Sequence, residues 1–331
     1  MNKLEKILLF VTMTFAGLPA YGDISKLDLP KGFTISNFTS NIDNARQMVE
    51  GDNFIFVGTR SAGNVYAVYK SDTNKVITII DGMDMPTGVA LKNGDLYIAE
   101  TDNIHVIKDI EQKLNSEAEI TTEIFFSDLP RKDMWNPMKK SWHGWKWIDF
   151  GPDGALYISE GVPCNVCDEE DARFGTILKL VNNKLSVYAD GVRNSVGFDW
   201  HPETDEMYFT DNGRDWMGDD IPPCELNRVT AAGNHFGFPF VHGKDIADDS
   251  YKEPEGFIYE EPVWQFQAHT APLGIKFYSG DSFPEYYKNG AFVAQHGSWN
   301  RSKKVGYKVL FMKFENGEVV SSETFIDGWL Q

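Results

Sequence analysis

The chain has 331 residues, of which 42% are hydrophobic and 14% aromatic, so it is long and apolar enough to bury a large core. Its formal net charge of −18 argues against nucleic acid and anionic membrane surfaces as partners, because both are themselves negatively charged. Solvated acidic loops account for most of this charge.

The first 22 residues have the pattern of an export signal. Lys3 and Lys6 make a basic start, residues 7–18 form an apolar run, and Ala20-Tyr21-Gly22 offers a cleavage site. The apolar run is too short to span a membrane comfortably. We therefore expect a signal peptide over residues 1–22 and one mature domain over residues 23–331, in the periplasm or outside the cell and not spanning a membrane.

Short strands follow one another along the mature chain, separated by turns rich in Gly, Asp and Asn. We expect them at residues 33–38, 46–49, 53–58, 65–68, 76–80, 104–107, 121–126, 176–180, 185–189, 226–229, 307–314 and 323–326. Between them recurs a longer pattern, in which a glycine-led apolar strand, a Gly/Asp turn and an apolar-aromatic strand end in an acidic or polar residue. Its copies span residues 85–100, 143–160, 194–211 and 272–295. Residues 237–262 form an irregular insertion, and no helix of consequence is evident.

Recurrence at roughly 50–85 residues with four short strands per repeat predicts an all-β fold of the β-propeller type. Because successive strands alternate in direction, the loop entering each inner strand and the loop after each second strand meet at one end of the propeller. These loops carry many polar side chains, which predicts a polar pocket on the axis. The residues concerned are Arg60, Thr87, Glu100, His143, Glu160, Arg193, Asn194, the run 211–220, His269 and the run 296–301.

Cys164 and Cys167 form a C-x-x-C pair. The next residue is Asp168 where a c-type haem site needs histidine, so haem attachment is excluded. A local disulfide that pins the loop is favoured over a redox-active thiol pair, because no thioredoxin-like pattern surrounds it. The third cysteine, Cys224, has no predicted partner.

Three strings in these loops resemble the glucose/sorbosone dehydrogenase family, and its sorbosone and pyranose dehydrogenase branch most closely. They are R-N-x-x-G from Arg193, N-G-x-D…E-L-N…G-x-P from Asn212, and H-G-S-W-N-R from His296. The resemblance covers essentially the whole mature chain. It implies a six-bladed propeller that uses pyrroloquinoline quinone (PQQ) and calcium to oxidise a sugar or a sugar-derived aldehyde or alcohol.

The resemblance also implies residue roles. His143 stands at the position of the general base, and Arg193 and Asn194 match the pair that contacts the quinone, where the guanidinium stabilises developing charge. His296, Arg301, Arg60 and Thr87 are the further cofactor-binding candidates. The calcium ligands are expected to be the backbone carbonyls of Gly213 and Arg214. Asp215, Asp219, Asp220 and Glu225 are either a second calcium site or a solvated acidic loop.

Two departures from the family pattern are visible. Thr87 stands where family members often have asparagine or glutamine, and the chain stops at Gln331, before the sixth blade with its G-R-P string. We therefore expect about five blades, residues 33–38 as the outer closing strand of a sixth, and an open ring with unpaired strand edges.

The leading interpretation is an exported quinone- and calcium-dependent dehydrogenase that passes electrons from a sugar to an external acceptor, a cytochrome or a quinone. A second is a metal-dependent lactonase, which would recruit Glu100, Glu160 and Asn194 as ligands but leaves H-G-S-W-N-R unexplained. A third is a propeller that binds a sugar or a protein without catalysis.

Overall fold

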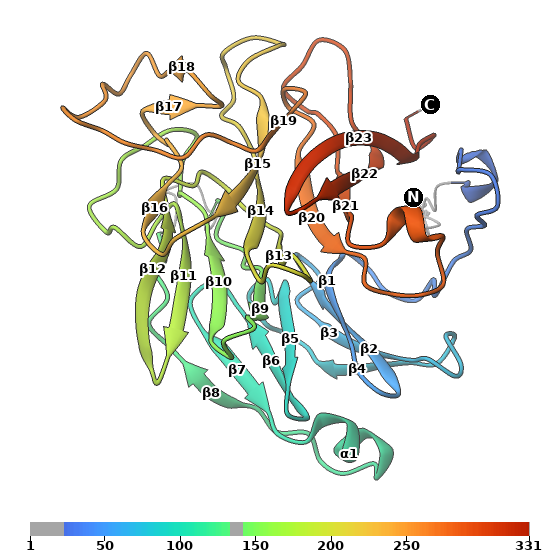
Figure 1. Ribbon diagram of the computed structural model, residues 1–331. Helices are drawn as coiled ribbons and strands as arrows, with labels where there is room; N and C mark the ends of the chain where they lie inside the picture. Colours follow the sequence, from blue (N-terminus) through green and yellow to red (C-terminus); the bar gives the residue numbers. More distant parts are fainter. Residues whose placement is uncertain (1–22, 133–141, 331) are drawn as a thin grey trace, which may run out of the picture.

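The computed structural model describes residues 23–132 and 142–330, so the expected signal peptide lies outside the described residues. Its strands form five blades of antiparallel sheet around a common axis (Figure 1). The all-β propeller predicted from the sequence is confirmed. In the described part of the chain the one α-helix is the short α1 (Ile110–Asn115), and no helix there is long and apolar enough to cross a membrane.

The first three strands of each blade follow one another in the chain, with the first strand innermost. Blade one is β1 (Ala45–Glu50), β2 (Phe54–Thr59), β3 (Val65–Tyr69) and β4 (Val76–Ile80). Blade two is β5 (Gly88–Lys92), β6 (Asp95–Ala99), β7 (Ile104–Ile107) and β8 (Glu123–Phe126). Blade three is β9 (Ile148–Phe150), β10 (Leu156–Glu160), β11 (Thr176–Val181) and β12 (Lys184–Asp190), extended by β16 (Asn234–His235). Blade four is β13 (Phe198–Trp200), β14 (Met207–Asp211), β15 (Cys224–Val229) and β19 (Trp264–Phe266), and blade five is β20 (Pro272–Phe277), β21 (Ala291–Gln295), β22 (Lys308–Glu315) and β23 (Glu318–Ile326).

The expected irregular insertion between β15 and β19 holds only a small hairpin, β17 (Val241–His242) with β18 (Ile246–Ala247).

The hydrophobic core lies between successive blades, because each sheet buries a face against the next blade in the ring. Phe54 and Phe56 of blade one pack with Ile98 of blade two, and Tyr208 of blade four packs with Phe277 of blade five. Two further clusters join blades two to three and three to four. At about 1.5–3 kcal/mol for each fully buried side chain, these interfaces dominate the stability of the ring.

The inner strands approach one another closely at the axis. Gly197 precedes β13, and a Cβ there would lie 2.0 Å from the carbonyl oxygen of Leu273, which explains the glycine at the head of this repeat. The buried Gln47 of β1 donates to the carbonyl of Ile148 and accepts from the backbone amides of Val89 and Ile148, so one side chain joins three blades.

Residues 33–38 were expected to form a strand, and this prediction was wrong. The N-terminal segment contacts blade five through a single bridge between Asp28 and Asp327, and then through Phe33. The Phe33 ring lies 4.8–5.3 Å from the rings of Phe283, Tyr287 and Phe325. Burial of this aromatic ring, rather than strand pairing, therefore decides the path of the segment.

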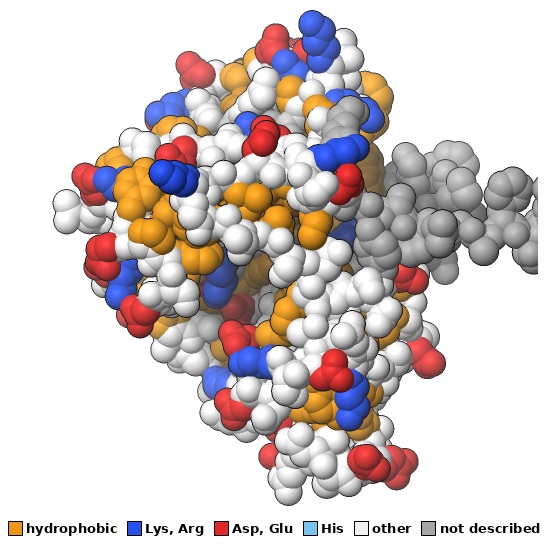
Figure 2. All heavy atoms as spheres, turned by 90° about the vertical axis from the view of Figure 1, so that its right-hand side faces the viewer, with side chains coloured by type: hydrophobic (Ala, Val, Ile, Leu, Met, Phe, Trp, Pro, Cys, Tyr) orange, Lys and Arg blue, Asp and Glu red, His pale blue; other side chains and the backbone are white. Residues whose placement is uncertain are grey.

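Apart from the β17–β18 hairpin, the described residues form no sheet beyond the five blades, so no sixth blade is seen among them, which matches the expected open ring. Blades five and one face each other across the open side, where both termini of the described chain lie (Figure 1). Figure 2 looks at this side and shows hydrophobic side chains exposed in patches. Because propeller blades pack face to face, what the open side leaves uncovered is sheet faces rather than the strand edges that we expected.

Candidate active site

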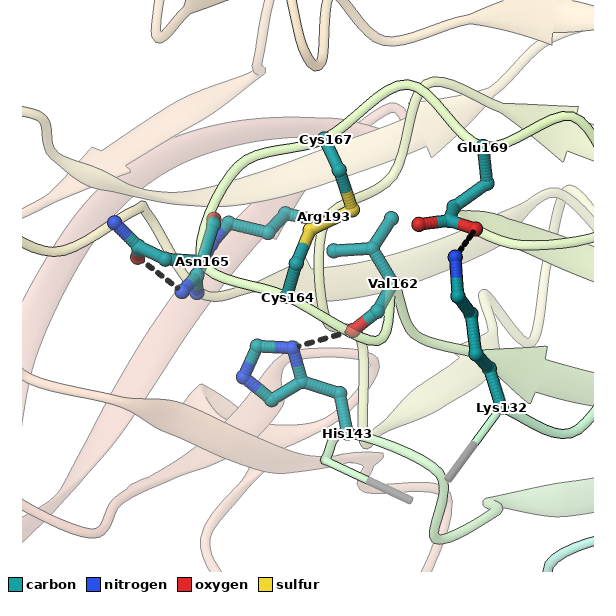
Figure 3. Close-up of a disulfide and its surroundings, with 8 residues drawn as sticks. All are labelled: Lys132, His143, Val162, Cys164, Asn165, Cys167, Glu169 and Arg193. Atoms are coloured by element: carbon teal, nitrogen blue, oxygen red, sulfur yellow. Dashed lines mark hydrogen bonds and ion pairs between the residues drawn. A yellow bond between two sulfur atoms is a disulfide. The ribbon is translucent and has the colours of Figure 1, made fainter. Parts of the chain in front are cut away.

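His143 lies just before β9, buried, with a backbone φ of 59° that is uncommon for a residue with a side chain. Its Nδ1 lies 2.9 Å from the carbonyl oxygen of Val162, which can only accept, so Nδ1 carries the proton. Nε2 has no hydrogen-bond partner among the described residues and presents its lone pair (Figure 3). Burial, together with the positive charges of Arg193 and Arg60, holds the pKa of His143 well below the ordinary histidine value. The ring is therefore a neutral base at neutral pH.

Arg193 is buried beside His143, and all of its guanidinium nitrogens have partners. Nε donates to the carbonyl of Asn165 and Nη2 to the Asn165 side chain, at 2.8 and 2.9 Å. Nη1 donates to the carbonyls of Asn212 and Gly213 at 3.0 and 3.1 Å, and Asp215 lies 3.5 Å from Nη2. The guanidinium is thus fixed in place by its partners. It supplies a positive charge to the site without changing its position.

Asn194 and Asn212 lie next to each other, since the Asn212 side chain donates to the Asn194 carbonyl at 2.9 Å. The Oδ1 atoms of both residues are buried and have no hydrogen-bond partner. Asn194 Oδ1 lies 3.1 Å from the point where a Cβ on Gly161 would stand, and that same point is 2.7 Å from the Cβ of His143. A pair of unpartnered amide oxygens therefore borders the base, and buried acceptors of this kind call for a bound donor or cation.

A positive cluster faces His143 from blade one. The Arg60 guanidinium stacks on Trp145 at 3.7 Å, and burial and the neighbouring Arg46 lower its pKa. Partial burial, Arg46 and Arg60 likewise lower the pKa of His296. Within the described chain neither Arg46 nor Arg60 has a carboxylate partner, although the protein carries a net charge of −18. Two half-buried arginines without counter-ions mark a site for an anionic ligand.

The structure places Arg301 away from this cluster. Its guanidinium binds the Asp219 carbonyl and, at 2.9 Å, the Asp220 carboxylate, and Ser302 donates to Asp219 at 2.9 Å. Arg301 therefore links the loop that follows β21 to the loop that follows β14. Thr87 is also occupied, because its hydroxyl donates to the Lys146 carbonyl at 2.9 Å.

The expected calcium residues are brought only partly together. Gly213 presents a carbonyl that already accepts from Arg193, whereas the Arg214 side chain turns away to bind Asp248. Asp215 contacts Arg193, and Glu225 accepts from Gly243 and Asn227. In the part of the chain that the structure describes, no three His, Cys, Asp or Glu side chains form a metal-binding group.

The two acids considered for a lactonase also have their own partners. Glu100 binds His105 at 2.7 Å, and Glu160 forms a fully buried ion pair with Lys146 at 2.5 Å. Burial, opposed by Lys146, raises the pKa of Glu160 to about 7. Neither acid points to a shared metal position.

The sequence did not point to Arg46 or Asn165 as site residues, and it placed Asn212 in the polar pocket only as part of the run 211–220. Arg46 was only the first residue of the predicted strand 46–49. Asn165 stands between the two cysteines, and that position was the one signal available. The predicted disulfide between Cys164 and Cys167 is confirmed, and Cys224 is free and buried.

The residues present fit the implied cofactors. Arg46 and Arg60 suit the carboxylates of PQQ, and the free amide oxygens of Asn194 and Asn212, with the Gly213 carbonyl, are the neutral oxygen donors that calcium accepts. The fit rests on unpartnered groups rather than on a ready cluster of carboxylates.

The fold and the buried polar residues around His143 together define a β-propeller with a polar site. A family model described as TrAA12-like matches residues 225–327. The calcium structure of a Trichoderma reesei carbohydrate-active enzyme of family AA12 has a TM-score of 0.68 at 18% identity, over 86% of this chain and 82% of that one. The holo form of the pyranose dehydrogenase PQQ domain from Coprinopsis cinerea has a TM-score of 0.71 at 14% identity, over 92% and 87%. The fold is shared with these proteins.

A closer relative in sequence is an uncharacterized protein of Borreliella burgdorferi. It is 35% identical over 321 residues, which cover 93% of this chain and 82% of the relative. The chain belongs to the family of that protein.

Proposed function

We propose that this protein is an oxidoreductase that oxidises a sugar or a sugar-derived aldehyde or alcohol, with PQQ and calcium as cofactors. The observation that carries the proposal is the free Nε2 of the neutral His143, which lies between the positive charges of Arg193 and Arg60. The shared fold with the pyranose dehydrogenase PQQ domain and with family AA12 supports it.

In this proposal Arg60, Arg46 and His296 hold the carboxylates of the quinone. Asn194, Asn212 and the Gly213 carbonyl hold calcium. When bound, the quinone supplies a hydride acceptor and calcium a Lewis acid.

His143 acts as the general base. Nε2 accepts the proton of the substrate hydroxyl while Nδ1–H stays on the Val162 carbonyl, so the ring keeps its orientation during the transfer. The imidazolium that results lies beside Arg193 and Arg60, and their charges favour rapid return of the proton to solvent. Arg193, fixed by its own partners, stabilises negative charge that develops in the pocket.

We further propose that the protein is exported and passes its electrons to a cytochrome or a quinone outside the cytoplasm. The basic and apolar pattern of residues 1–22 supports export. The disulfide between Cys164 and Cys167 supports an oxidising compartment.

Dye reduction tests the function. Protein loaded with PQQ and calcium should reduce an artificial electron acceptor in the presence of aldoses, and His143→Ala should lower the rate about 10²- to 10⁴-fold while the affinity for PQQ persists. His105→Ala is the matched control, because His105 lies on blade two and binds Glu100. Wild-type activity in His143→Ala would refute the role of the base.

A further inference from the structure

The segment that follows β10 carries the disulfide and lies beside His143 and Arg193 (Figure 3). The bond between Cys164 and Cys167 closes a loop that contains only Asn165 and Val166. Two residues in so tight a ring have little conformational freedom, so whatever Asn165 binds is bound by a rigid element.

The side chain of Asn165 and its backbone carbonyl hydrogen-bond to two partners, Arg193 and Asp215. Its carbonyl accepts from Arg193 Nε at 2.8 Å, and its Oδ1 accepts from Arg193 Nη2 at 2.9 Å. The same Oδ1 accepts from the backbone amide of Asp215 at 2.8 Å, and Nδ2 donates to the Asp215 carbonyl at 3.0 Å. The side chain thereby joins the guanidinium to the loop that carries Gly213.

The same segment also holds the base. The carbonyl of Val162 fixes His143 Nδ1 at 2.9 Å, and the amide of Val162 donates to the Arg193 carbonyl at 3.0 Å. The base, the guanidinium and the predicted calcium loop thus share one scaffold of six residues, from Val162 to Cys167.

We propose that Asn165 is a positioning residue, held in register by the disulfide, that fixes the Arg193 guanidinium and the Gly213–Asp215 loop. What Arg193 does for catalysis rests on the proposed function, but the positioning itself is a property of the chain alone. Without the Asn165 side chain, one edge of a buried guanidinium loses its neutral acceptor, and Arg193 turns toward Asp215 and the pocket.

The test uses the full-length protein without cofactor and reads the Arg193 Nη2–H signals by NMR, assigned with Arg193→Lys. In the wild type this group is buried and donates to the Asn165 side-chain oxygen Oδ1 at 2.9 Å, so exchange of its protons with water should be slow. Asn165→Ala should speed exchange at least 10-fold and shift the His143 ring signals. Asn165→Asp should restore slow exchange, because the carboxylate keeps the acceptor that Arg193 and Asp215 use.

Three further samples control the result. Val166→Ala shortens the side chain of the other residue inside the disulfide loop. It should leave the Arg193 exchange rate and the His143 ring signals unchanged. Reduction by a dithiol, which passes two electrons and two protons to the cysteine pair and is itself oxidised to a disulfide, should reproduce the effect of Asn165→Ala. Cys164→Ser with Cys167→Ser should do the same.

Cofactor-loaded protein then separates the two proposals. Asn165→Ala should weaken PQQ affinity by about 10-fold or more, while Val166→Ala should not. If Asn165→Ala matches Val166→Ala in exchange, ring signals and affinity, the positioning role is overturned while the proposed function stands. If the exchange and ring signals move as expected but the wild type never binds PQQ, the proposed function fails and the positioning role stands.

Discussion

At the residue scale, one hydrogen bond decides what His143 can do. The Val162 carbonyl forces the proton onto Nδ1 and leaves Nε2 as the free base. The sequence predicted both His143 and Arg193 as site residues, Arg193 because it begins the R-N-x-x-G string and His143 because it stands at the position of the general base in the family that the chain resembles. It could not predict that Asn165 occupies the Arg193 guanidinium, since that contact joins loops 28 residues apart.

The pH profile of the reaction tests the state of His143. Because burial, Arg193 and Arg60 lower its pKa, Nε2 stays unprotonated below the ordinary value of 6.5. We expect kcat/KM to stay flat from pH 8 to below 6.5 and to fall only as the pH passes the lowered pKa. Arg60→Ala removes one positive neighbour and should move this acid limb upward by up to about one pH unit. An acid limb at or above pH 6.5 in the wild type would contradict this account.

Gly161 tests how closely the base is confined. A Cβ at this position would meet the Cβ and carbonyl oxygen of His143 at 2.7 and 2.8 Å, so Gly161→Ala must displace His143. A displacement of about 1 Å costs about 10²-fold in rate. Gly274→Ala is the matched control, since its added Cβ would meet only Trp147, at 3.8 Å. Equal kcat values for the two variants would show that the confinement does not matter.

At the scale of the elements, a buried ion pair joins the start of β9 to the end of β10 within blade three. Lys146, just before β9, and Glu160, at the end of β10, have no exposed side-chain surface. The sequence predicted both strands but assigned Glu160 to a polar pocket, because spacing does not show that a lysine fourteen residues earlier neutralises it.

Breaking this buried pair should be far more costly than replacing it. Glu160→Ala leaves the Lys146 charge buried and should lower the free energy of unfolding by about 3–5 kcal/mol in urea titrations. The double variant Lys146→Met, Glu160→Leu should recover most of this loss. Lys313→Ala breaks an exposed pair with Glu315 and should cost less than about 1 kcal/mol. A double variant as unstable as Glu160→Ala would mean that the ion pair has a role beyond charge compensation.

At the scale of the whole molecule, the repeat pattern predicted the blades, because glycine-led inner strands and alternating apolar residues are local signals. The fate of residues 33–38 was not predictable in this way. Their alternation matches a strand, but the aromatic cluster of Phe283, Tyr287 and Phe325 that captures Phe33 is assembled from residues about 250 positions later.

Global stability should fall as the pH rises from mildly acidic to alkaline. Asp211 and Glu225 face each other on β14 and β15, and burial raises the pKa of both carboxyls. Folding therefore favours their protonated forms, and this stabilisation is lost as the pH rises from the ordinary glutamate value of 4.5 through the raised native value.

Glu225→Gln tests this pH dependence. The amide can still accept from Gly243 and can donate to Asn227 Oδ1, which has no partner. We expect the variant to be more stable than the wild type at pH 8, by about 1.4 kcal/mol for each unit by which burial raises the pKa of Glu225. Near pH 4 the two proteins should be equally stable. Urea titrations at both pH values measure this, and an unchanged pH slope would contradict it.

The central claim is that the axial pocket binds an anionic quinone together with calcium. Isothermal titration calorimetry of the full-length protein with PQQ, with and without calcium, tests it most directly. The account predicts saturable binding of one PQQ per chain, strengthened by calcium and weakened at least 10-fold when Arg46 and Arg60 are both changed to alanine. Calcium binding without any affinity for PQQ, or no binding of either, would contradict it.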